Sequence, residues 1–552
     1  MENLKIKKIV LGISALPVSL GCMAINQTEV TEQRNILVIV CDQLRPDFLN
    51  VYGGKMIECE GTNELARMGV VFDNAITASP VSAPARASMM TGRYPSTHGV
   101  WCNDRPFNEG MEYLPQRMAD NGYITAAFGK LHHTPAADSK GFDVYIPMEE
   151  SRLKEMEPYV AYMKGRYPGI KMDRYNDLSK NFGFEKPMAD HYDYWTTTNA
   201  LCFLTDYKEN KFEGKPFFVW LSLQGPHGPY DPPAEVKGKA DASQIPDRIK
   251  EVSGDIPSVV EKRQAFHMTE DGMKKSRIAY AEKLKMEDEQ VERVLNRLKE
   301  NNLLEKTTIL FVADHGDQIG DHNLNQKGPF PYPYHQNIPM ILANCPGVKG
   351  GTRSDILVSN IDIATTCLEL AGDKRPLGLS RSLAGMLNDP AMQREVNFSE
   401  FCDSYKMVEN KRYRMAYYPF EGKIMLFDKL KDPCYLQNLS GSESLASVKL
   451  DFMKSLMDFQ VVCKGVHVEA QDCTTEVQNG IGKLHPDWKN DGFEVNFPLT
   501  YSKWKYLKEH NQDYHYNDFC IPMKVMRAYG AFWEHPAYKK EKKLLINKNK
   551  HI

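Results

Sequence analysis

Two short polar clusters contain residue types that bind divalent cations. In CDQ, Asp42 and Gln43 directly follow the apolar run NILVIV, and in ADHGD, Asp314 and His315 follow TTILFV. Carboxylate, amide and imidazole groups together would form a mostly oxygen-ligand cation site. A single acidic turn more often satisfies backbone donors within a loop. Two such turns, each at the end of a predicted core strand, favour a metal site.

The stretch SAPARASMMTG, residues 82–92, suggests a second kind of chemistry. Ser82 stands where a helix should begin, with Pro84 in its first turn, so Ser82 could serve as an N-cap. A helix N-terminus also attracts anions, and Arg86 adds a full positive charge. Further basic and imidazole groups stand in other motifs, at Lys130, His132, His227 and Lys327. Together with a metal, these groups suit a sulfate or phosphate ester.

The elements that would position these groups alternate between strands and helices. Strands are expected at 35–43, 70–77, 217–223, 307–313 and 338–347, and helices at 62–68, 276–303 and 361–372. This alternation predicts an α/β fold in which helices flank a large, mostly parallel central sheet. In such sheets ligands bind beyond the carboxyl ends of the strands, which is where the polar clusters stand.

Length and charge limit the domain organisation and the partners. The chain has 552 residues, 42% of them hydrophobic, and a formal net charge of -3, so no global field favours nucleic acid. We expect a catalytic domain at 30–391 and a smaller α+β C-terminal subdomain at 392–525, where short strands and turns begin. A lysine-rich, solvated tail is expected at 526–552.

The N-terminus resembles an export signal. Three lysines precede an apolar run at 9–20, and Gly21 and Cys22 follow it at once. Residues 1–22 are therefore expected to be a signal peptide of the lipoprotein type, with Cys22 as the lipidated residue, although Ser19 and Leu20 reverse the usual order. The expected location is the periplasm or the outer membrane. The twelve cysteines show no CxxC pair and no zinc-like spacing.

Five motifs in order resemble the formylglycine-dependent (type I) sulfatases of the alkaline phosphatase superfamily. The resemblance extends over about residues 35–439 and rests on CDQ, SAPARASMMTG, GKLH at 129–132, PHGP at 226–229 and DHGD at 314–317. The segment LFDKLKDPCYLQNL is similar to the family's C-terminal motif. Any one motif would be only suggestive, but their order makes the resemblance specific.

The resemblance implies a mechanism and its residues. Ser82 would be oxidised to Cα-formylglycine, and one oxygen of its hydrate would attack sulfur. His227, helped by Lys327, would protonate the leaving oxygen, and His132 would help the second hydroxyl expel sulfate. The remaining roles fall to cations, with Arg86 and Lys130 holding the hydrate and Lys327 and the metal neutralising sulfate. The implied metal ligands are Asp42, Gln43, Asp314 and His315.

Several positions depart from the family pattern or leave alternatives open. Gln43 replaces a frequent aspartate; Ca²⁺ is still expected, because aspartate oxygens dominate. A serine in the signature implies maturation by an anaerobic, radical-type enzyme. His133 is expected to be a satisfied local histidine, and Asp317 and Asp321 to be loop groups. The segments 101–108 and PYPYHQNIP around His335 could each read the sugar or form a surface turn.

Two rival functions remain. A phosphodiester or phosphonate monoester hydrolase of the same superfamily could share formylglycine and an Asp-Gln/Asp-His pattern, but that group replaces the Lys and His of the GKLH motif with hydroxyl side chains. Lys130 and His132 therefore favour a sulfatase. A non-catalytic binder of sulfated glycans with unmodified Ser82 would need no general acid. The expected function is an exo-acting sulfatase on sulfated carbohydrates.

Overall fold

The computed structural model describes residues 33–108, 110–172, 175–250, 252–264, 268–402 and 404–465. The predicted signal peptide with Cys22, the basic tail and most residues after 460 lie outside these ranges. Within them, no helix is long and apolar enough to span a membrane.

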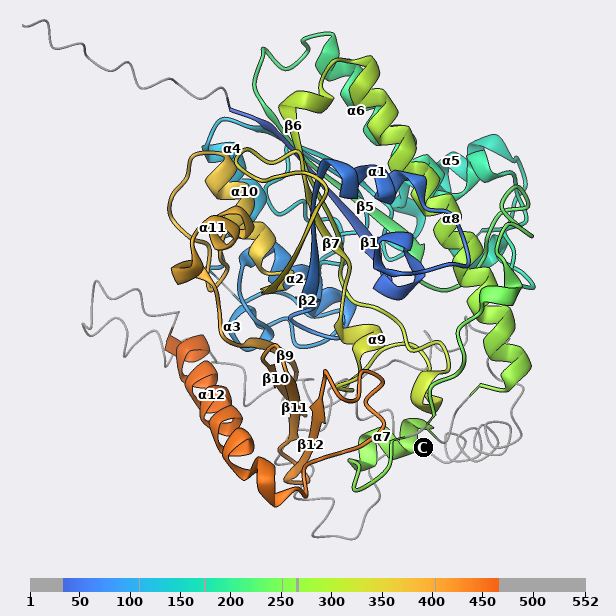
Figure 1. The fold of residues 1–552 in the computed structure, drawn as a ribbon. Coiled ribbons are helices and arrows are strands. Elements are labelled where there is room, and N and C mark those ends of the chain that lie inside the picture. Colours follow the sequence, from blue (N-terminus) through green and yellow to red (C-terminus); the bar gives the residue numbers. More distant parts are fainter. Residues whose placement is uncertain are drawn as a thin grey trace, which may run out of the picture. The chain divides into compact units, whose positions relative to one another are not determined.

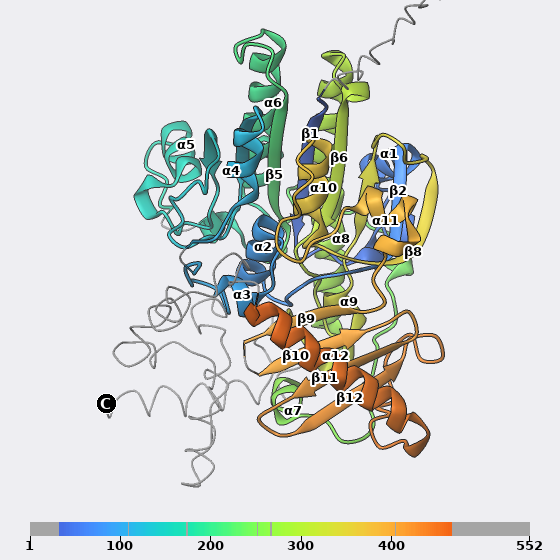
Figure 2. The same ribbon diagram turned by 90° about the vertical axis from the view of Figure 1, so that its left-hand side faces the viewer.

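An eight-stranded sheet forms the centre of the catalytic part (Figures 1 and 2). In their order across the sheet, its strands are β4 (Val144–Pro147), β3 (Ile124–Gly129), β5 (Phe217–Pro226), β1 (Asn35–Asp42), β6 (Thr307–Ala313), β7 (Met340–Ala343), β2 (Gly69–Ile76) and β8 (Thr352–Ser359). Only β7 runs antiparallel to its neighbours, so the predicted mostly parallel sheet is confirmed.

The central strands β1, β5 and β6 are buried along their whole length, because helices cover both faces of the sheet. The helices are α1 (Glu60–Met68), α2 (Ser82–Thr91), α3 (Pro95–His98), α4 (Leu114–Asp120), α5 (Pro158–Arg166), α6 (Tyr192–Lys208), α7 (Ser258–Gln264), α8 (Glu270–Glu300), α9 (Pro333–Gln336), α10 (Asp362–Leu370), α11 (Leu383–Asn388) and α12 (Ala446–Gly465). Helices α1, α6 and α8 pack together on one face, and α2, α4 and α10 on the other (Figure 1).

Helix α8 begins six residues before the predicted start. The Thr269 side chain caps it by accepting a hydrogen bond from Gly272 N. An apolar stripe along the helix is buried, at Ala281, Leu284, Val291, Val294 and Leu298, and Ile278 at its edge is half-buried. Lys283, from the polar part of the same helix, is buried as well.

A smaller antiparallel sheet follows the catalytic part. Its order is β12 (Lys423–Asp428), β11 (Tyr413–Tyr418), β10 (Tyr405–Glu409) and β9 (Asn397–Phe401). Helix α12 packs on it, with Phe452 and Leu456 against Val408 and Met415. This sheet and helix form the smaller α+β subdomain that the sequence predicts.

Candidate active site

Ser82 is the first residue of α2 and is buried at the carboxyl edge of the large sheet. Its hydroxyl lies 2.8 Å from His315 Nε2 and 2.8 Å from Lys327 Nζ. The alternative that Ser82 is the helix N-cap is wrong, because the N-cap is Val81, whose carbonyl accepts from Ala85 N. The Ser82 side chain is therefore directed at ionisable groups rather than at the helix.

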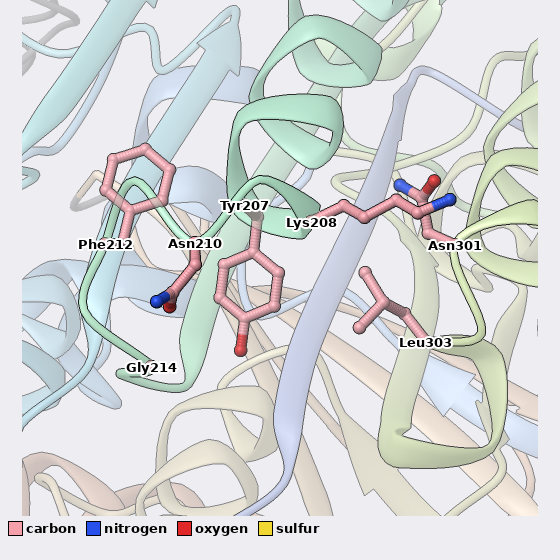
Figure 3. A pocket seen from close by; sticks show the side chains of 7 residues that line it. All are labelled: Tyr207, Lys208, Asn210, Phe212, Gly214, Asn301 and Leu303. Carbon is pink, nitrogen blue, oxygen red and sulfur yellow. The ribbon is translucent and has the colours of Figure 1, made fainter.

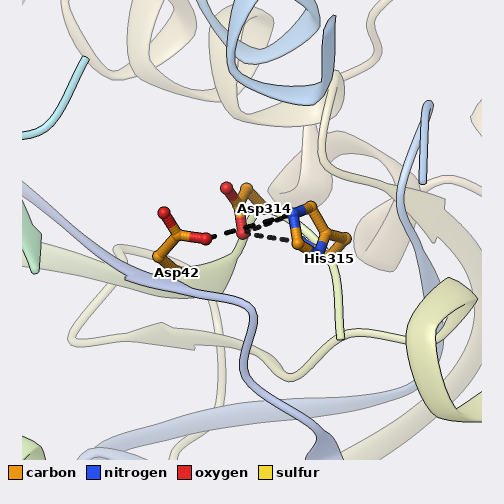
Figure 4. A group of neighbouring side chains, drawn as sticks. All are labelled: Asp42, Asp314 and His315. Carbon is orange, nitrogen blue, oxygen red and sulfur yellow. Dashed lines mark hydrogen bonds and ion pairs between the residues drawn. The ribbon is translucent and has the colours of Figure 1, made fainter. Parts of the chain in front are cut away.

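Four predicted metal ligands converge beside Ser82. Ligand atoms of Asp42, Asp314 and His315 lie within 4.8 Å of one another (Figure 4). Asp42 Oδ1 and Gln43 Oε1 are buried and have no hydrogen-bond partner among the described residues. Because buried polar oxygens need a partner, these orphaned atoms fit a divalent cation.

Neighbouring groups orient two of these ligands. Gln43 Nε2 donates to the Asp317 carboxylate, which leaves the amide oxygen as the ligand atom. His315 Nδ1 lies 2.8 Å from the Gly316 carbonyl, so Nδ1 carries the proton and Nε2 is the free ligand nitrogen. Burial lowers the pKa of His315 to about 4, so its ring is neutral and can coordinate.

Arg86, one turn into α2, ties the helix to the ends of the strands. Its Nε donates to Asp314 Oδ2 at 2.8 Å, and its Nη1 donates to the carbonyl of Lys130 at 2.6 Å and to Ser222 Oγ at 2.7 Å. Its Nη2 lies 3.4 Å from Asp42 Oδ2. The guanidinium therefore contacts both predicted metal-ligand carboxylates and the strand end that presents Lys130.

Lys130 and His132 directly follow β3. Lys130 Nζ lies 2.5 Å from Asp42 Oδ2 and 2.7 Å from Glu150 Oε1. Burial alone would raise the pKa of Asp42, but Lys130, His227 and Arg86 hold it well below its usual range. Burial lowers the pKa of His132, and nearby cations lower it further. Both predicted groups therefore reach the site.

His227 and Lys327 complete the site. His227 Nδ1 lies 2.6 Å from the Gly228 carbonyl, so this nitrogen is the protonated one in the neutral ring. Burial lowers the pKa of His227, as does the ammonium of Lys327. The buried Lys327 reaches Ser82 from the loop before α9. All ten predicted site residues thus lie at one edge of the sheet, on six different segments.

Two acidic residues that no motif indicated also line the site. Ligand atoms of Glu150, Asp42 and His227 lie within 4.8 Å of one another, and the Lys130 ammonium bonds both carboxylates. Glu149 accepts from the backbone N–H groups of Leu131 and His132. Both acids stand in the run MEE after β4, where nothing local in the sequence distinguishes them from solvated residues.

Other expectations need correction. His133 is buried, and neither ring nitrogen has a hydrogen-bond partner among the described residues, so it is not a satisfied histidine. His335 does not lie in a surface turn, because it is buried between Gln318 Nε2 and the Gly328 carbonyl. These two bonds fix the loop before α9.

Three further groups have structural contacts. Asp317 accepts from Gln43 and from the Tyr230 hydroxyl, and Asp321 is paired with Arg45 and Arg277. In the segment 101–108, Asn103 Oδ1 accepts from Ala83 N and so satisfies a free donor at the start of α2.

A separate pocket lies near the amino end of β1 (Figure 3), lined by Tyr207, Lys208, Asn210, Phe212, Gly214, Asn301 and Leu303. The Tyr207 hydroxyl bonds Asn35, the first residue of β1, so this pocket is remote from Asp42 at the other end of the strand.

The fold and the site together define a class of enzyme. A large, mostly parallel sheet carries a group of candidate cation ligands and the N-terminus of a buried helix at its carboxyl edge. Residues 34–373 match the sulfatase family, and residues 320–462 match the C-terminal region of N-sulphoglucosamine sulphohydrolase. The chain belongs to the sulfatase family and is a sulfuric ester hydrolase, which confirms the resemblance found in its motifs.

Individual relatives show the range of the family. The chain is similar to an arylsulfatase of Clostridium perfringens, with 26% identity over 77% of this chain and 93% of the relative. It is similar to an N-acetylglucosamine-6-O-sulfatase of Bacteroides thetaiotaomicron, with 24% identity over 82% and 90%. The fold resembles a phosphonate monoester hydrolase of Silicibacter pomeroyi, with a TM-score of 0.67, 22% identity and coverage of 78% and 95%.

Proposed function

We propose that this protein is an exported sulfatase that hydrolyses sulfate esters of carbohydrates, using formylglycine derived from Ser82 and one divalent cation, Ca²⁺. The observation that carries the proposal is the position of the Ser82 hydroxyl, 2.8 Å from both His315 Nε2 and Lys327 Nζ at the start of a buried helix. A plain serine here has no adjacent free base, because His315 belongs to the metal-ligand set. Sulfatases normally use a metal and formylglycine, and the ligand set and Ser82 fit both.

Charge defines how the substrate binds. Lys327 bonds the Ser82 hydroxyl, and Arg86 and Lys130 both contact the neighbouring Asp42, so these three cations attract the sulfate group and hold it in line with the attacking oxygen. The cation, held by Asp42, Gln43, Asp314 and His315, supplies further positive charge against the sulfate oxygens. The formylglycine hydrate supplies the nucleophile and a second hydroxyl whose deprotonation releases sulfate.

The two histidines move the protons. In the free enzyme, burial and nearby cations, Lys327 for His227 and Arg152 for His132, hold the pKa values of both histidines low, so both rings are neutral. A bound sulfate ester offsets the charge of Lys327, which raises the pKa of His227 and lets it take up the proton that it passes to the leaving oxygen. His132 remains neutral beside Arg152 and accepts a proton from the second hydroxyl.

A carbohydrate substrate, export and lipidation rest on other observations. The similarity to an N-acetylglucosamine-6-O-sulfatase supports a sulfated sugar. The basic and apolar segment before Cys22 supports export to the periplasm or outer membrane with a lipid on Cys22. The serine in the signature supports maturation by a radical-type enzyme.

A phosphonate monoester hydrolase is the second candidate. The similar fold favours it, whereas Lys130 and His132 favour the sulfatase.

Two measurements test the proposal. Protein from an anaerobic host is assayed on matched 4-nitrophenyl sulfate, phosphodiester and phosphonate esters, and the expected result is a strong preference for sulfate. Mass spectrometry of the peptide with Ser82 should show formylglycine. A preference for a phosphorus ester would establish the second candidate, and unmodified serine with sulfate binding but no turnover would indicate a glycan binder.

A further inference from the structure

A buried lysine on α8 contacts the segment that carries His227. The Lys283 side chain has no exposed surface, although the polar sequence around it predicts a solvated position. Fully buried lysines are rare, and a buried charge is costly unless it is paired and hydrogen-bonded. Lys283 therefore calls for a physical reason.

The partners of Lys283 supply that reason. Its Nζ donates to the carbonyl of His227 at 2.8 Å and to the carbonyl of Pro229 at 2.9 Å. It also pairs with Asp231 Oδ1 at 2.9 Å and donates to the Tyr192 hydroxyl at 2.5 Å. One ammonium thus holds two carbonyls of the segment 227–229 that follows β5.

The carbonyl between those two completes the arrangement. The Gly228 oxygen lies 2.6 Å from His227 Nδ1, and a carbonyl can only accept, so it fixes the proton of the neutral ring on Nδ1. Nε2 is then the nitrogen that takes up and delivers a proton. Because Lys283 holds the backbone on both sides of Gly228, it also holds the carbonyl that orients the His227 ring.

Asp231 neutralises the charge of Lys283. Asp231 accepts from Tyr192 and Ser179 as well as from Lys283, and Lys283 helps hold the pKa of this carboxyl low, at about 2, against the effect of burial. Among the described residues, neither Lys283 nor Asp231 bonds Ser82 or the predicted metal-ligand carboxylates. Lys283 contacts the site through the backbone of the segment 227–229.

We infer that Lys283 is a positioning residue for the general acid, holding the His227 segment so that the ring presents Nε2 to the leaving oxygen. This inference rests on the proposed function, in which His227 protonates that oxygen. Loss of Lys283 should then impair the reaction most where the leaving group most needs a proton. Loss of a residue that only stabilises the fold would lower kcat/KM for all esters by the same factor.

The test compares Lys283→Met with wild type on 4-nitrophenyl sulfate and phenyl sulfate, whose leaving groups need little and more protonation, respectively. The ratio of kcat/KM for the first ester to that for the second should rise about tenfold or more. Lys285→Met, two residues along α8 with only a 3.8 Å ion pair to Glu292, should leave the ratio unchanged. Lys283→Met/Asp231→Asn removes both buried charges and should show the same selective loss even if the single variant folds poorly.

A second comparison separates positioning from stability. His227→Ala should raise the same ratio, and adding Lys283→Met to it should cause little further loss, because the oriented group is already absent. If Lys283→Met lowers kcat/KM equally on both esters, so that the ratio is unchanged, the inference is overturned. Additive losses in His227→Ala/Lys283→Met would overturn it as well. If wild-type protein hydrolyses neither sulfate, the proposed function fails instead, which keeps the two outcomes distinct.

Discussion

At the scale of single residues, the hydroxyl of Ser82 contacts Lys327 and His315, a predicted metal ligand. We predict that protein made without a maturation enzyme is folded but inactive, because an unmodified serine lacks the second hydroxyl that releases sulfate. Ser82→Cys, coexpressed with the aerobic cysteine-oxidising enzyme, should regain turnover of 4-nitrophenyl sulfate, and mass spectrometry should show formylglycine at position 82. Ser82→Ala should stay inactive with a similar Tm. Full activity of Ser82→Ala would contradict the role of this residue.

Glu157 makes the stability of the protein depend on pH. Glu157 Oε1 accepts from Glu149 N at 2.5 Å, Oε2 is buried without a hydrogen-bond partner among the described residues, and burial raises the pKa of Glu157 from 4.5 to about 7. The folded state thus favours the protonated acid. The contribution of Glu157 to the free energy of unfolding is therefore complete below pH 4.5. As the pH rises to about 7, up to about 3 kcal/mol of this free energy is lost.

Urea unfolding at several pH values checks this prediction. Relative to Glu157→Gln, which stays neutral, wild type should lose free energy of unfolding as the pH rises from 4.5 to 7. Glu185→Gln, at a partly exposed residue paired with Lys180, is the control and should follow wild type. Parallel curves for wild type and Glu157→Gln would mean that the buried acid is ionised throughout.

Sequence reasoning located Asp42, Gln43, Asp314, His315 and His227 because the carboxyl ends of parallel strands meet at one edge. Glu149, Glu150 and Lys283 could not be found in this way, because their roles depend on contacts between elements: Glu149 and Lys283 are buried, and half-buried Glu150 bonds Lys130. Their neighbours in the chain are polar, so local composition predicts exposure. Only tertiary packing shows that Lys283 faces the His227 segment rather than solvent.

At the scale of elements, strong apolar runs such as β1, β5 and β6 were predictable, whereas β3, β4 and β8 were not. Strand β3 reads ITAAFG, with two alanines and a glycine that have little β propensity, and it becomes a strand through its pairing with β5. The antiparallel direction of β7 also follows from the chain path, which no local pattern encodes.

At the end of β3, Gly129 lets the strand approach β5 closely. Gly129 has φ +93°, and a Cβ there would lie 1.9 Å from the Ser222 carbonyl of β5, the atom that accepts from Lys130 N. Gly129→Ala should therefore separate the two strand ends and displace Lys130, lowering kcat/KM about a hundredfold and reducing Tm. Gly122→Ala is the matched control, because its φ is +86° but a Cβ there meets nothing within 4 Å. It should lower Tm slightly and leave activity intact; equal effects would show that backbone strain alone is responsible.

At the scale of the whole molecule, the smaller sheet holds the loop that presents Lys327. Three successive carbonyls of this loop, those of Pro329, Phe330 and Pro331, accept from Tyr418, Tyr405 and Arg414, respectively. These donors stand on β10 and β11 and are all buried. The smaller sheet therefore acts on the site through Lys327, whose ammonium reaches Ser82.

We predict that Tyr405→Phe/Tyr418→Phe weakens sulfate binding as well as stability. Removing two hydroxyl donors should lower the free energy of unfolding by about 1 kcal/mol each, while the freed loop lets Lys327 move and raises KM for 4-nitrophenyl sulfate several-fold. Thermal unfolding and steady-state kinetics measure the two effects. Tyr417→Phe, next to Tyr418 on β11 but packed toward α12, should change neither, because no hydrogen bond among the described residues joins its hydroxyl to the loop. Unchanged KM in the double variant would show that the catalytic part holds Lys327 without help from the second sheet.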